Sequence, residues 1–203
     1  MKTDEGYIKF ISDWTEGPAP ERAATDLLDT WRRPLHRAGL IGHYADLGIG
    51  YGNISVRYGG PGQFIISCAQ TGHLPTTTGE HYALVTACDM DENRVACVGP
   101  AEASSESLTH AALYQLDSEI NAVVHVHSLR LWEELRGHVA TTSVNVAYGT
   151  PQMAHEFARL YRDTDFPTSG IAVMAGHEEG IVSIGRTLEQ AALRVLSIAA
   201  GPG

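Results

Sequence analysis

The stretch NAVVHVH (residues 121–127) decides the fold of this chain, because it predicts a buried strand that carries two histidines. Alternate residues of a strand point to the same face of a sheet. His125 and His127 can therefore reach one point in space. A lone strand histidine is usually just a hydrogen-bonded core or surface residue. Two imidazoles among valines need a partner that offsets their desolvation, and imidazole suits zinc and related metals.

Two further side chains can complete such a site. His177 follows the apolar run IAVMAG (residues 171–176), where a strand is expected to reach the rim of the sheet. Glu106 follows Ser104 and Ser105 at the expected start of a helix. There a serine N-cap and an early carboxylate are also favourable without any catalysis. Three nitrogen ligands with an open position are typical of catalytic zinc. Beside it, Glu106 would serve as a general acid or base, and the helix start could bind an anion.

Size and composition favour one soluble globular domain over residues 1–203. The chain has 43% hydrophobic and 19% charged residues and a formal net charge of −10. A nucleic-acid partner is not expected, because no cluster of lysine and arginine is present to neutralise phosphates. Residues 1–20 are weakly patterned and are expected to be an N-terminal extension.

The cysteines and the N-terminal sequence favour a cytoplasmic protein. Cys68, Cys88 and Cys97 have no metal-like spacing, and their odd number predicts buried free thiols in a reducing compartment. The acidic N-terminus lacks the apolar segment of a signal peptide. No apolar run approaches the roughly 18 residues of a membrane span.

The hydrophobic pattern predicts strands that come mainly as hairpins, with helices between them. This order favours a mostly antiparallel sheet with helices against both faces. We expect Pro34 to kink or interrupt the first helix. Helices are expected over residues 21–38, 105–116, 129–135, 151–162 and 187–199, and strands over residues 54–58, 63–69, 82–88, 94–98, 122–127, 171–177 and 181–184.

Together, these motifs resemble the class II aldolase/adducin family. The resemblance runs from about residue 24 to residue 199 and depends most on the combination of Ser-Ser-Glu, His-x-His and a distant histidine. The glycine turns only support it. In chain order the motifs are GNISVR (52–57), TG (71–72), SSE (104–106), NAVVHVH (121–127), YGT (148–150) and His177.

The resemblance implies a three-layer α/β/α fold with a mixed, mostly antiparallel central sheet, assembled as a homo-oligomer, with a tetramer favoured. It implies Zn²⁺ held by His125, His127 and His177, with Glu106 as a fourth ligand or as the acid/base. It also implies substrate-phosphate binding without lysine. The residues at the matching positions are Asn53, Thr71, Gly72, Ser104 and Ser105.

The function implied is that of a metal-dependent, aldolase-type lyase of carbohydrate metabolism. It would act through a metal-stabilised enediolate on a small hydroxy-carbonyl or sugar-phosphate substrate. An epimerase or dehydratase of the same family, or a non-catalytic module like the adducin head, are the alternatives.

Three departures from the family pattern bear on the substrate. Residues 128–147 form a short segment without the tyrosine that aldolases of this family carry there. Gly50 stands where a phosphate-binding threonine is common, and Glu178 replaces the glycine that normally follows the metal histidine. The pair Glu178 and Glu179 is expected to bring negative charge close to the site.

Overall fold

A nine-stranded sheet forms the centre of the protein in the computed structural model, which describes residues 7–201. The expected extension over residues 1–20 lies partly outside this range, since residues 1–6 are not described. In spatial order the strands are β1 (Ile11–Glu16), β7 (Arg94–Gly99), β6 (Tyr82–Asp89), β5 (Phe64–Ser67), β4 (Asn53–Arg57), β8 (Ala122–His127), β11 (Gly180–Gly185), β10 (Ile171–Val173) and β9 (Ala140–Thr141).

The sheet is mixed but mostly antiparallel, as the sequence predicts. Only its two outermost pairs, β1 with β7 and β9 with β10, run parallel. All pairs between them are antiparallel. A separate two-stranded hairpin joins β2 (Gly42–Tyr44) to β3 (Ile49–Tyr51).

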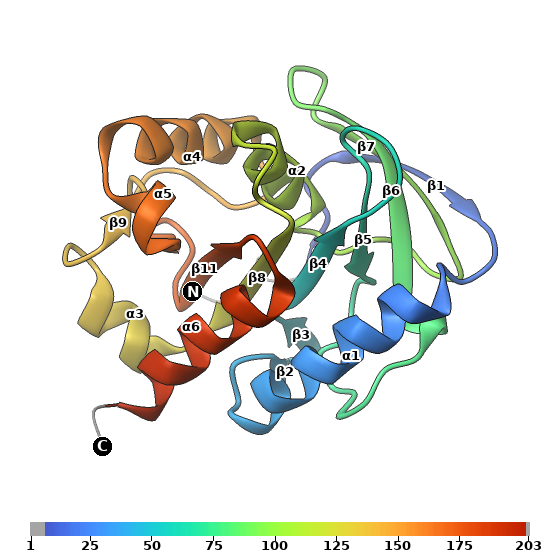
Figure 1. Cartoon of the computed structure of the whole chain (residues 1–203), viewed down its shortest axis with the longest axis horizontal. Helices are drawn as coiled ribbons and strands as arrows, with labels where there is room; N and C mark the ends of the chain where they lie inside the picture. Colours follow the sequence, from blue (N-terminus) through green and yellow to red (C-terminus); the bar gives the residue numbers. More distant parts are fainter. Residues whose placement is uncertain (1–6, 202–203) are drawn as a thin grey trace.

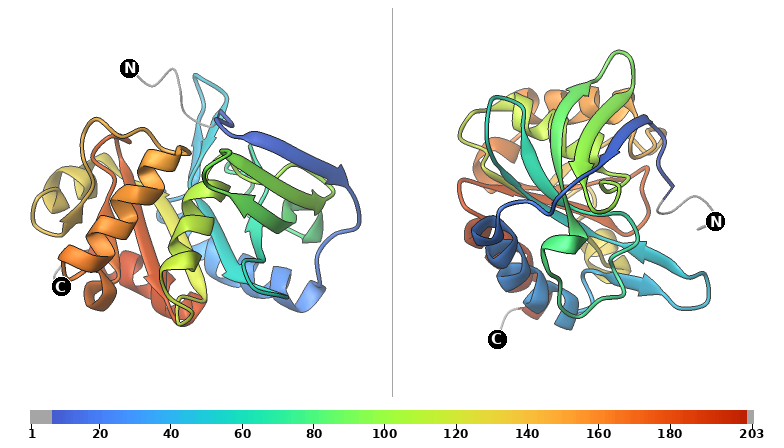
Figure 2. Two further views of the ribbon diagram at one scale, coloured as in Figure 1. Left: turned by 90° about the horizontal axis from the view of Figure 1, so that it is seen from above. Right: turned by 90° about the vertical axis from the view of Figure 1, so that its right-hand side faces the viewer.

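Helices cover both faces of the sheet, which gives the predicted three layers (Figures 1 and 2). α1 and α6 pack together on one face, and α2 packs with α4 on the other. The helices are α1 (Arg22–Arg37), α2 (Ser107–Leu116), α3 (Leu129–Leu135), α4 (Pro151–Asp163), α5 (Phe166–Ser169) and α6 (Leu188–Ala200), with a short 3₁₀ turn, η1 (Gly79–His81).

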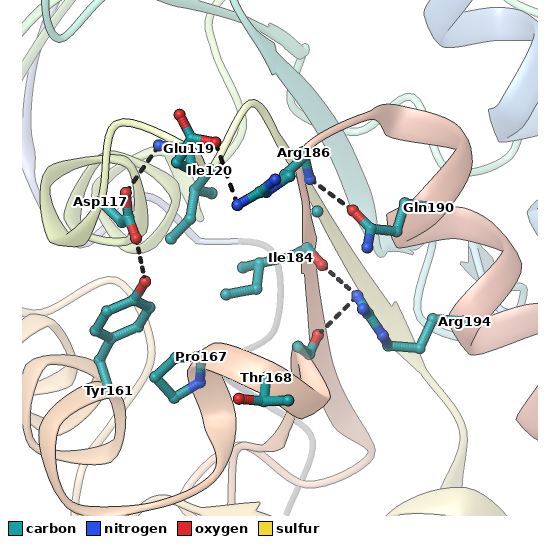
Figure 3. A pocket seen from close by; sticks show the side chains of 12 residues that line it. Asp117, Glu119, Ile120, Tyr161, Pro167, Thr168, Ile184, Arg186, Gln190 and Arg194 are labelled. Atoms are coloured by element: carbon teal, nitrogen blue, oxygen red, sulfur yellow. Dashed lines mark hydrogen bonds and ion pairs between the residues drawn. The ribbon is translucent and has the colours of Figure 1, made fainter.

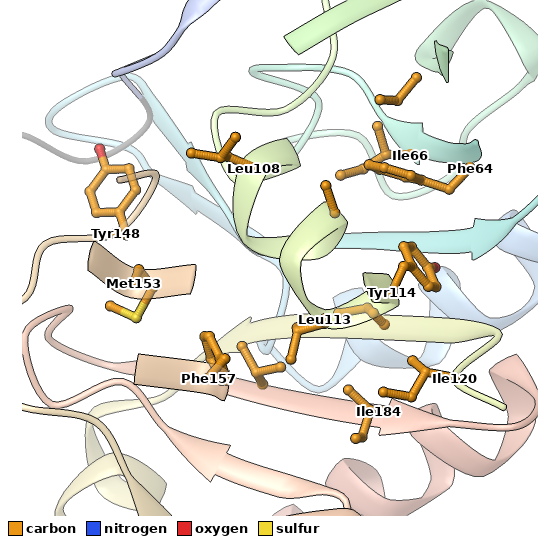
Figure 4. Close-up of a cluster of buried hydrophobic side chains, with 14 of the residues drawn as sticks. Phe64, Ile66, Leu108, Leu113, Tyr114, Ile120, Tyr148, Met153, Phe157 and Ile184 are labelled. Atoms are coloured by element: carbon orange, nitrogen blue, oxygen red, sulfur yellow. The ribbon is translucent and has the colours of Figure 1, made fainter. Parts of the chain in front are cut away.

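Strand β8 contributes to a hydrophobic core on each side of the sheet. Val123 belongs to the core under α2 and α4, part of which Figure 4 shows. Val124 and Val126 belong to the core under α1 and α6. Because side chains alternate along a strand, His125 and His127 share the face of Val123. They lie where the strand ends.

The structure corrects four sequence-based expectations. Ile11–Glu16, within the expected N-terminal extension, forms an edge strand that the hydrophobic pattern did not predict. The expected strand over residues 171–177 ends at Val173, so that His177 lies in the turn before β11. Helix α2 begins two residues later than expected. Pro34 lies inside α1 and does not interrupt it, because it stands in the last turn.

Two other expectations concern chemistry rather than shape. Cys68, Cys88 and Cys97 are all free thiols, and burial raises the pKa of Cys68 and of Cys88 to about 12. Among residues 7–201, no helix is both long and apolar enough to cross a membrane.

Candidate metal centre

Three histidines from distant parts of the chain converge at the end of β8. One nitrogen from each of His125, His127 and His177 can be chosen so that all three lie within 4.8 Å of one another. The Nε2 atoms of His125 and His127 are 3.1 Å apart. Two nitrogens bound to one tetrahedral zinc would be separated by about 3.3 Å, given Zn–N bonds of about 2.0–2.1 Å. The spacing therefore fits a single divalent cation.

The electrostatics of the cluster also suit a metal. His125, His127 and His177 are 1%, 2% and 4% exposed. Burial lowers the pKa of His125 well below its usual range, and the nearby His177 and His110 act in the same direction. His125 is therefore neutral, which is the form that binds metals.

Glu106 lies beside this cluster but is not one of the three converging groups. Its Oε1 atom is 3.4 Å from Nδ1 of His177, and the side chain is 3% exposed. The residue is the N-cap of α2, at the point where the preceding turn joins the helix. The amide of Glu106 is held 3.3 Å from Oγ of Ser104. Serine at this position therefore orders the turn, and the carboxylate stays next to the histidines.

Aromatic rings enclose the histidines. The ring of Tyr148 stacks on His177 with 4.3 Å between centroids, and the ring of Tyr51 stacks on His127 at 5.4 Å. Gly149, next to Tyr148, has a φ of +64° and packs where a Cβ atom would come within 3.0 Å of the Ser105 carbonyl. Glycine is required at such a close approach with positive φ.

A second pair of polar residues lies against His127. The Tyr44 hydroxyl donates to Oε2 of Glu179 at 2.5 Å and is 3.2 Å from Nδ1 of His127. Glu179 is buried, whereas Glu178 is exposed. Of the two glutamates, only Glu179 places its carboxylate at the site.

All five residues that the family resemblance implies for phosphate binding line one small pocket. Asn53 lies opposite His125 in the pairing of β4 with β8, so this pocket lies next to the histidines. The lining includes no lysine or arginine. The lining residues are Gly50, Tyr51, Gly52, Asn53, Cys68, Ala69, Gln70, Thr71, Gly72, Ser104 and Ser105.

Close backbone packing shapes this pocket. Any side chain at Gly72 would collide with the carbonyl of Gly42 in the β2–β3 hairpin. The amide of Gly50 donates to Oε1 of Gln70 at 3.0 Å. The Gly50 amide is therefore already hydrogen-bonded within the protein, at the position where the family resemblance places a threonine.

Another pocket lies at the opposite end of β8 and β11 and is separate from these residues (Figure 3). The charged side chains that line it form hydrogen bonds and ion pairs with other groups of the protein. Tyr161 donates to Asp117 at 2.5 Å, Arg186 is 3.4 Å from Glu119, and Arg194 donates to backbone carbonyls. The structure gathers no predicted site residue there.

The fold and the site together define an α/β protein with a buried three-histidine cluster at one end of its central sheet. The sequence model of the class II aldolase and adducin N-terminal domain matches residues 39–200. The chain belongs to this family. No curated protein has a sequence that matches it.

Solved structures show the same fold at low sequence identity. A sugar-phosphate aldolase from Thermotoga maritima is 16% identical, with a TM-score of 0.67, over 88% of this chain and 91% of the other. An L-fuculose 1-phosphate aldolase is 17% identical, with a TM-score of 0.65, over 90% and 85%. The N-terminal class II aldolase domain of a conserved protein from Thermoplasma acidophilum is 16% identical, with a TM-score of 0.59, over 91% and 94%.

Sequence reasoning did not single out two residues of the site. Tyr44 lies in a segment without a motif, and only its contact across 83 positions of the chain places it at His127. Glu179 was expected only as part of an acidic pair. No sequence signal separates it from Glu178, because both lie between His177 and Gly180.

Proposed function

We propose that this protein is a metal-dependent lyase of the aldolase type that cleaves a small hydroxy-carbonyl or phosphorylated sugar substrate. One observation carries the proposal. The buried cluster of His125, His127 and His177 lies beside a pocket lined with hydroxyl and amide groups. This arrangement offers a cation site and an anion site next to each other, as a phosphorylated hydroxy-carbonyl compound requires.

The pocket residues would hold the anionic end of the substrate. Ser104 and Ser105 offer hydroxyl groups, and Asn53 offers a side-chain amide. The Thr71 hydroxyl donates to the Cys68 carbonyl at 2.9 Å and shapes the pocket. Because the lining has no basic side chain, binding would depend on hydrogen-bond donors and the nearby N-terminus of α2. This suits weak, reversible binding of a phosphate or carboxylate group.

The three histidines would hold a divalent cation, for which Zn²⁺ is our first candidate. Such a cation supplies Lewis-acid polarisation of a carbonyl group. Glu106 would carry the proton that the reaction takes from one substrate atom and returns to another. Its burial keeps bulk water away from this transfer, and its position beside His177 lets it act at the cation site.

Product analysis tests the reaction. The zinc-loaded protein is incubated with a panel of ketose phosphates, and the products are separated. Cleavage should give an aldehyde and dihydroxyacetone phosphate. An isomeric sugar would instead indicate an epimerase, and one product plus water a dehydratase. No turnover of any panel member would count against an aldolase.

A non-catalytic module like the adducin head is the competing function. The short segment of residues 128–147, which lacks tyrosine, favours this alternative. The retained, buried histidine cluster favours an enzyme. Elemental analysis separates them: an enzyme should hold about one metal ion per chain. Substoichiometric metal that a chelator removes without loss of folding would favour the module.

We also infer a homo-oligomer, with a tetramer favoured. Exposed apolar side chains near the N-terminal edge of the sheet support association, notably Tyr7, Ile11 and Trp14, which are 61%, 50% and 42% exposed. Light scattering of the purified protein measures the assembly. A monomer at all concentrations would contradict the inference.

The role of Glu106 gives the first specific prediction. Replacing it in Glu106→Gln should lower kcat by about 10²-fold or more, because a general acid or base contributes about that much. The variant should remain folded and should still bind metal through the histidines. Glu119→Gln, at an exposed position at the other end of the sheet, is the matched control. Equal kcat values for the two variants would remove Glu106 from the mechanism.

A further inference from the structure

In the turn between β10 and β11, Glu179 points its carboxylate toward the histidines, and its backbone adopts an unfavourable conformation to do so. Glu179 has a φ of +70°, in the left-handed region that residues other than glycine rarely adopt. Two backbone hydrogen bonds fix this conformation. The Ser128 amide donates to the Glu179 carbonyl at 3.0 Å, and the Gly180 amide donates to the His177 carbonyl at 2.9 Å. Such strain is often found at functional sites.

Glu179 ends a hydrogen-bonded chain that begins at His127. The Tyr44 hydroxyl has one proton, which it donates to Oε2 of Glu179, 2.5 Å away. The phenol oxygen can then only accept from Nδ1 of His127, 3.2 Å away. With its proton on Nδ1, the neutral imidazole keeps a lone pair on Nε2. That atom faces Nε2 of His125 at 3.1 Å.

His125 is oriented by a backbone carbonyl rather than by side chains. Its Nδ1 atom lies 3.2 Å from the backbone carbonyl of Ile181, in the strand beside it. A main-chain acceptor thus fixes the tautomer of His125, while side chains fix that of His127. The hydrogen bonds of Tyr44 and Glu179 can be removed by mutation without changing the sheet, so their contribution can be measured.

We propose that Tyr44 and Glu179 are positioning residues for metal binding, which fix the tautomer and ring orientation of His127 so that Nε2 faces the cation. This inference rests on the proposed function, since it requires the three histidines to bind a metal. Partners that orient a metal-binding histidine typically contribute 10- to 100-fold to metal affinity. Glu179 is not a metal ligand in this scheme. It acts on His127 through Tyr44, and its Oε2 atom is itself 3.9 Å from Nδ1 of His127.

Metal affinity of the full chain tests the proposal. Zn²⁺ binding is measured by competition with a chromophoric chelator for the wild type, Tyr44→Phe and Glu179→Gln. Both variants should bind about 10- to 100-fold more weakly. Glu178→Gln, which changes the exposed neighbour, should bind as the wild type does. The Co²⁺ absorption spectrum of both variants should also shift, because it reports ligand geometry rather than stability.

The outcomes are distinct. If wild-type protein binds neither ion, the proposed function fails and the inference fails with it. If the wild type binds and both variants match it in affinity and spectrum, the inference alone is overturned. Circular dichroism checks folding. Should Glu179→Gln fail to fold, Tyr44→Phe, which removes one hydroxyl from a hairpin, decides the question.

Discussion

His110 is a fully buried histidine that does not belong to the metal cluster. Its Nδ1 atom lies 2.7 Å from Oγ of Ser55, which is in turn 2.7 Å from the Tyr114 hydroxyl. Burial lowers the pKa of His110 to about 3. The side chain therefore bonds to the core of the sheet rather than to the carboxylate of Glu106, one helical turn before it. It is a structural residue that must stay neutral.

This burial predicts a dependence of stability on pH. Between the folded pKa of about 3 and the ordinary value of 6.5, only the unfolded chain binds a proton at this residue. The contribution to the free energy of unfolding is therefore constant above pH 6.5 and falls by up to about 1.4 kcal/mol for each pH unit below it.

Urea denaturation of metal-free protein, from neutral pH down to about pH 4.5, measures this slope. His110→Gln should lose less stability on acidification than the wild type, because the titrating group is gone. His138→Gln, at an exposed histidine, should keep the wild-type slope. Parallel slopes for the wild type and His110→Gln would show that this imidazole is protonated in the folded state.

At the scale of residues, sequence reasoning identified the histidine pair because two imidazoles two apart on an apolar strand are chemically unusual. His177 and Glu106 were expected to complete the site from their places at a strand end and a helix start, and the family resemblance then assigned them as a ligand and as a ligand or acid/base. Tyr44 could not be predicted, because its place at His127 depends on how the β2–β3 hairpin folds over the sheet. The contribution of Glu179 depends on a backbone conformation that its residue type disfavours.

Helix α1 holds the loop that forms one wall of the small pocket. Arg32 is 1% exposed, and its guanidinium donates to the carbonyls of Leu74 at 2.6 Å and Thr71 at 2.7 Å. Asp29, one turn earlier, accepts from the amide and hydroxyl of Thr77 at 2.6 and 2.9 Å. A single helix thus fixes a loop with little regular structure of its own.

Arg32→Lys should lower the free energy of unfolding by about 2 kcal/mol, because lysine keeps the charge but cannot reach both carbonyls as the planar guanidinium does. Arg22→Lys is the matched control. Its exposed side chain pairs with Asp26 on the surface of the same helix, and such a pair contributes only about 0.3–0.5 kcal/mol. Urea denaturation measures both. A loss for Arg32→Lys no larger than that of the control would show that the loop is held by other contacts.

At the scale of elements, the sequence predicted best where the pattern is local. The strand Ala122–His127 and the helix Leu129–Leu135 occur with the expected bounds, because a valine run and a serine N-cap define them. Strand β1 was missed because nearly all its side chains are exposed. Only its distant partner β7, paired from Ile11 with Arg94 onward, makes it a strand.

The candidate cation site joins parts of the molecule that fold from distant segments. β8 supplies two histidines, the turn before β11 supplies the third, and the N-terminus of α2 supplies Glu106. The order of hairpins and helices in the sequence predicted a sheet with helices on both faces. How closely the three imidazoles approach one another could not follow from it, because the register of β8 with β11, with His127 opposite Gly180, sets that spacing.

A ligand that binds only the folded state raises the free energy of unfolding by RT ln(1 + [L]/Kd), where [L] is the free ligand concentration. Zn²⁺ at 100 times its Kd should therefore raise the free energy of unfolding by about 2.7 kcal/mol, and EDTA should reverse the gain. His177→Ala should abolish this increment, because it leaves only the two histidines of β8 as nitrogen ligands. His155→Ala, at an exposed position on α4, should retain it. Thermal unfolding with and without metal measures each case, and an equal gain for His177→Ala would place the bound ion elsewhere.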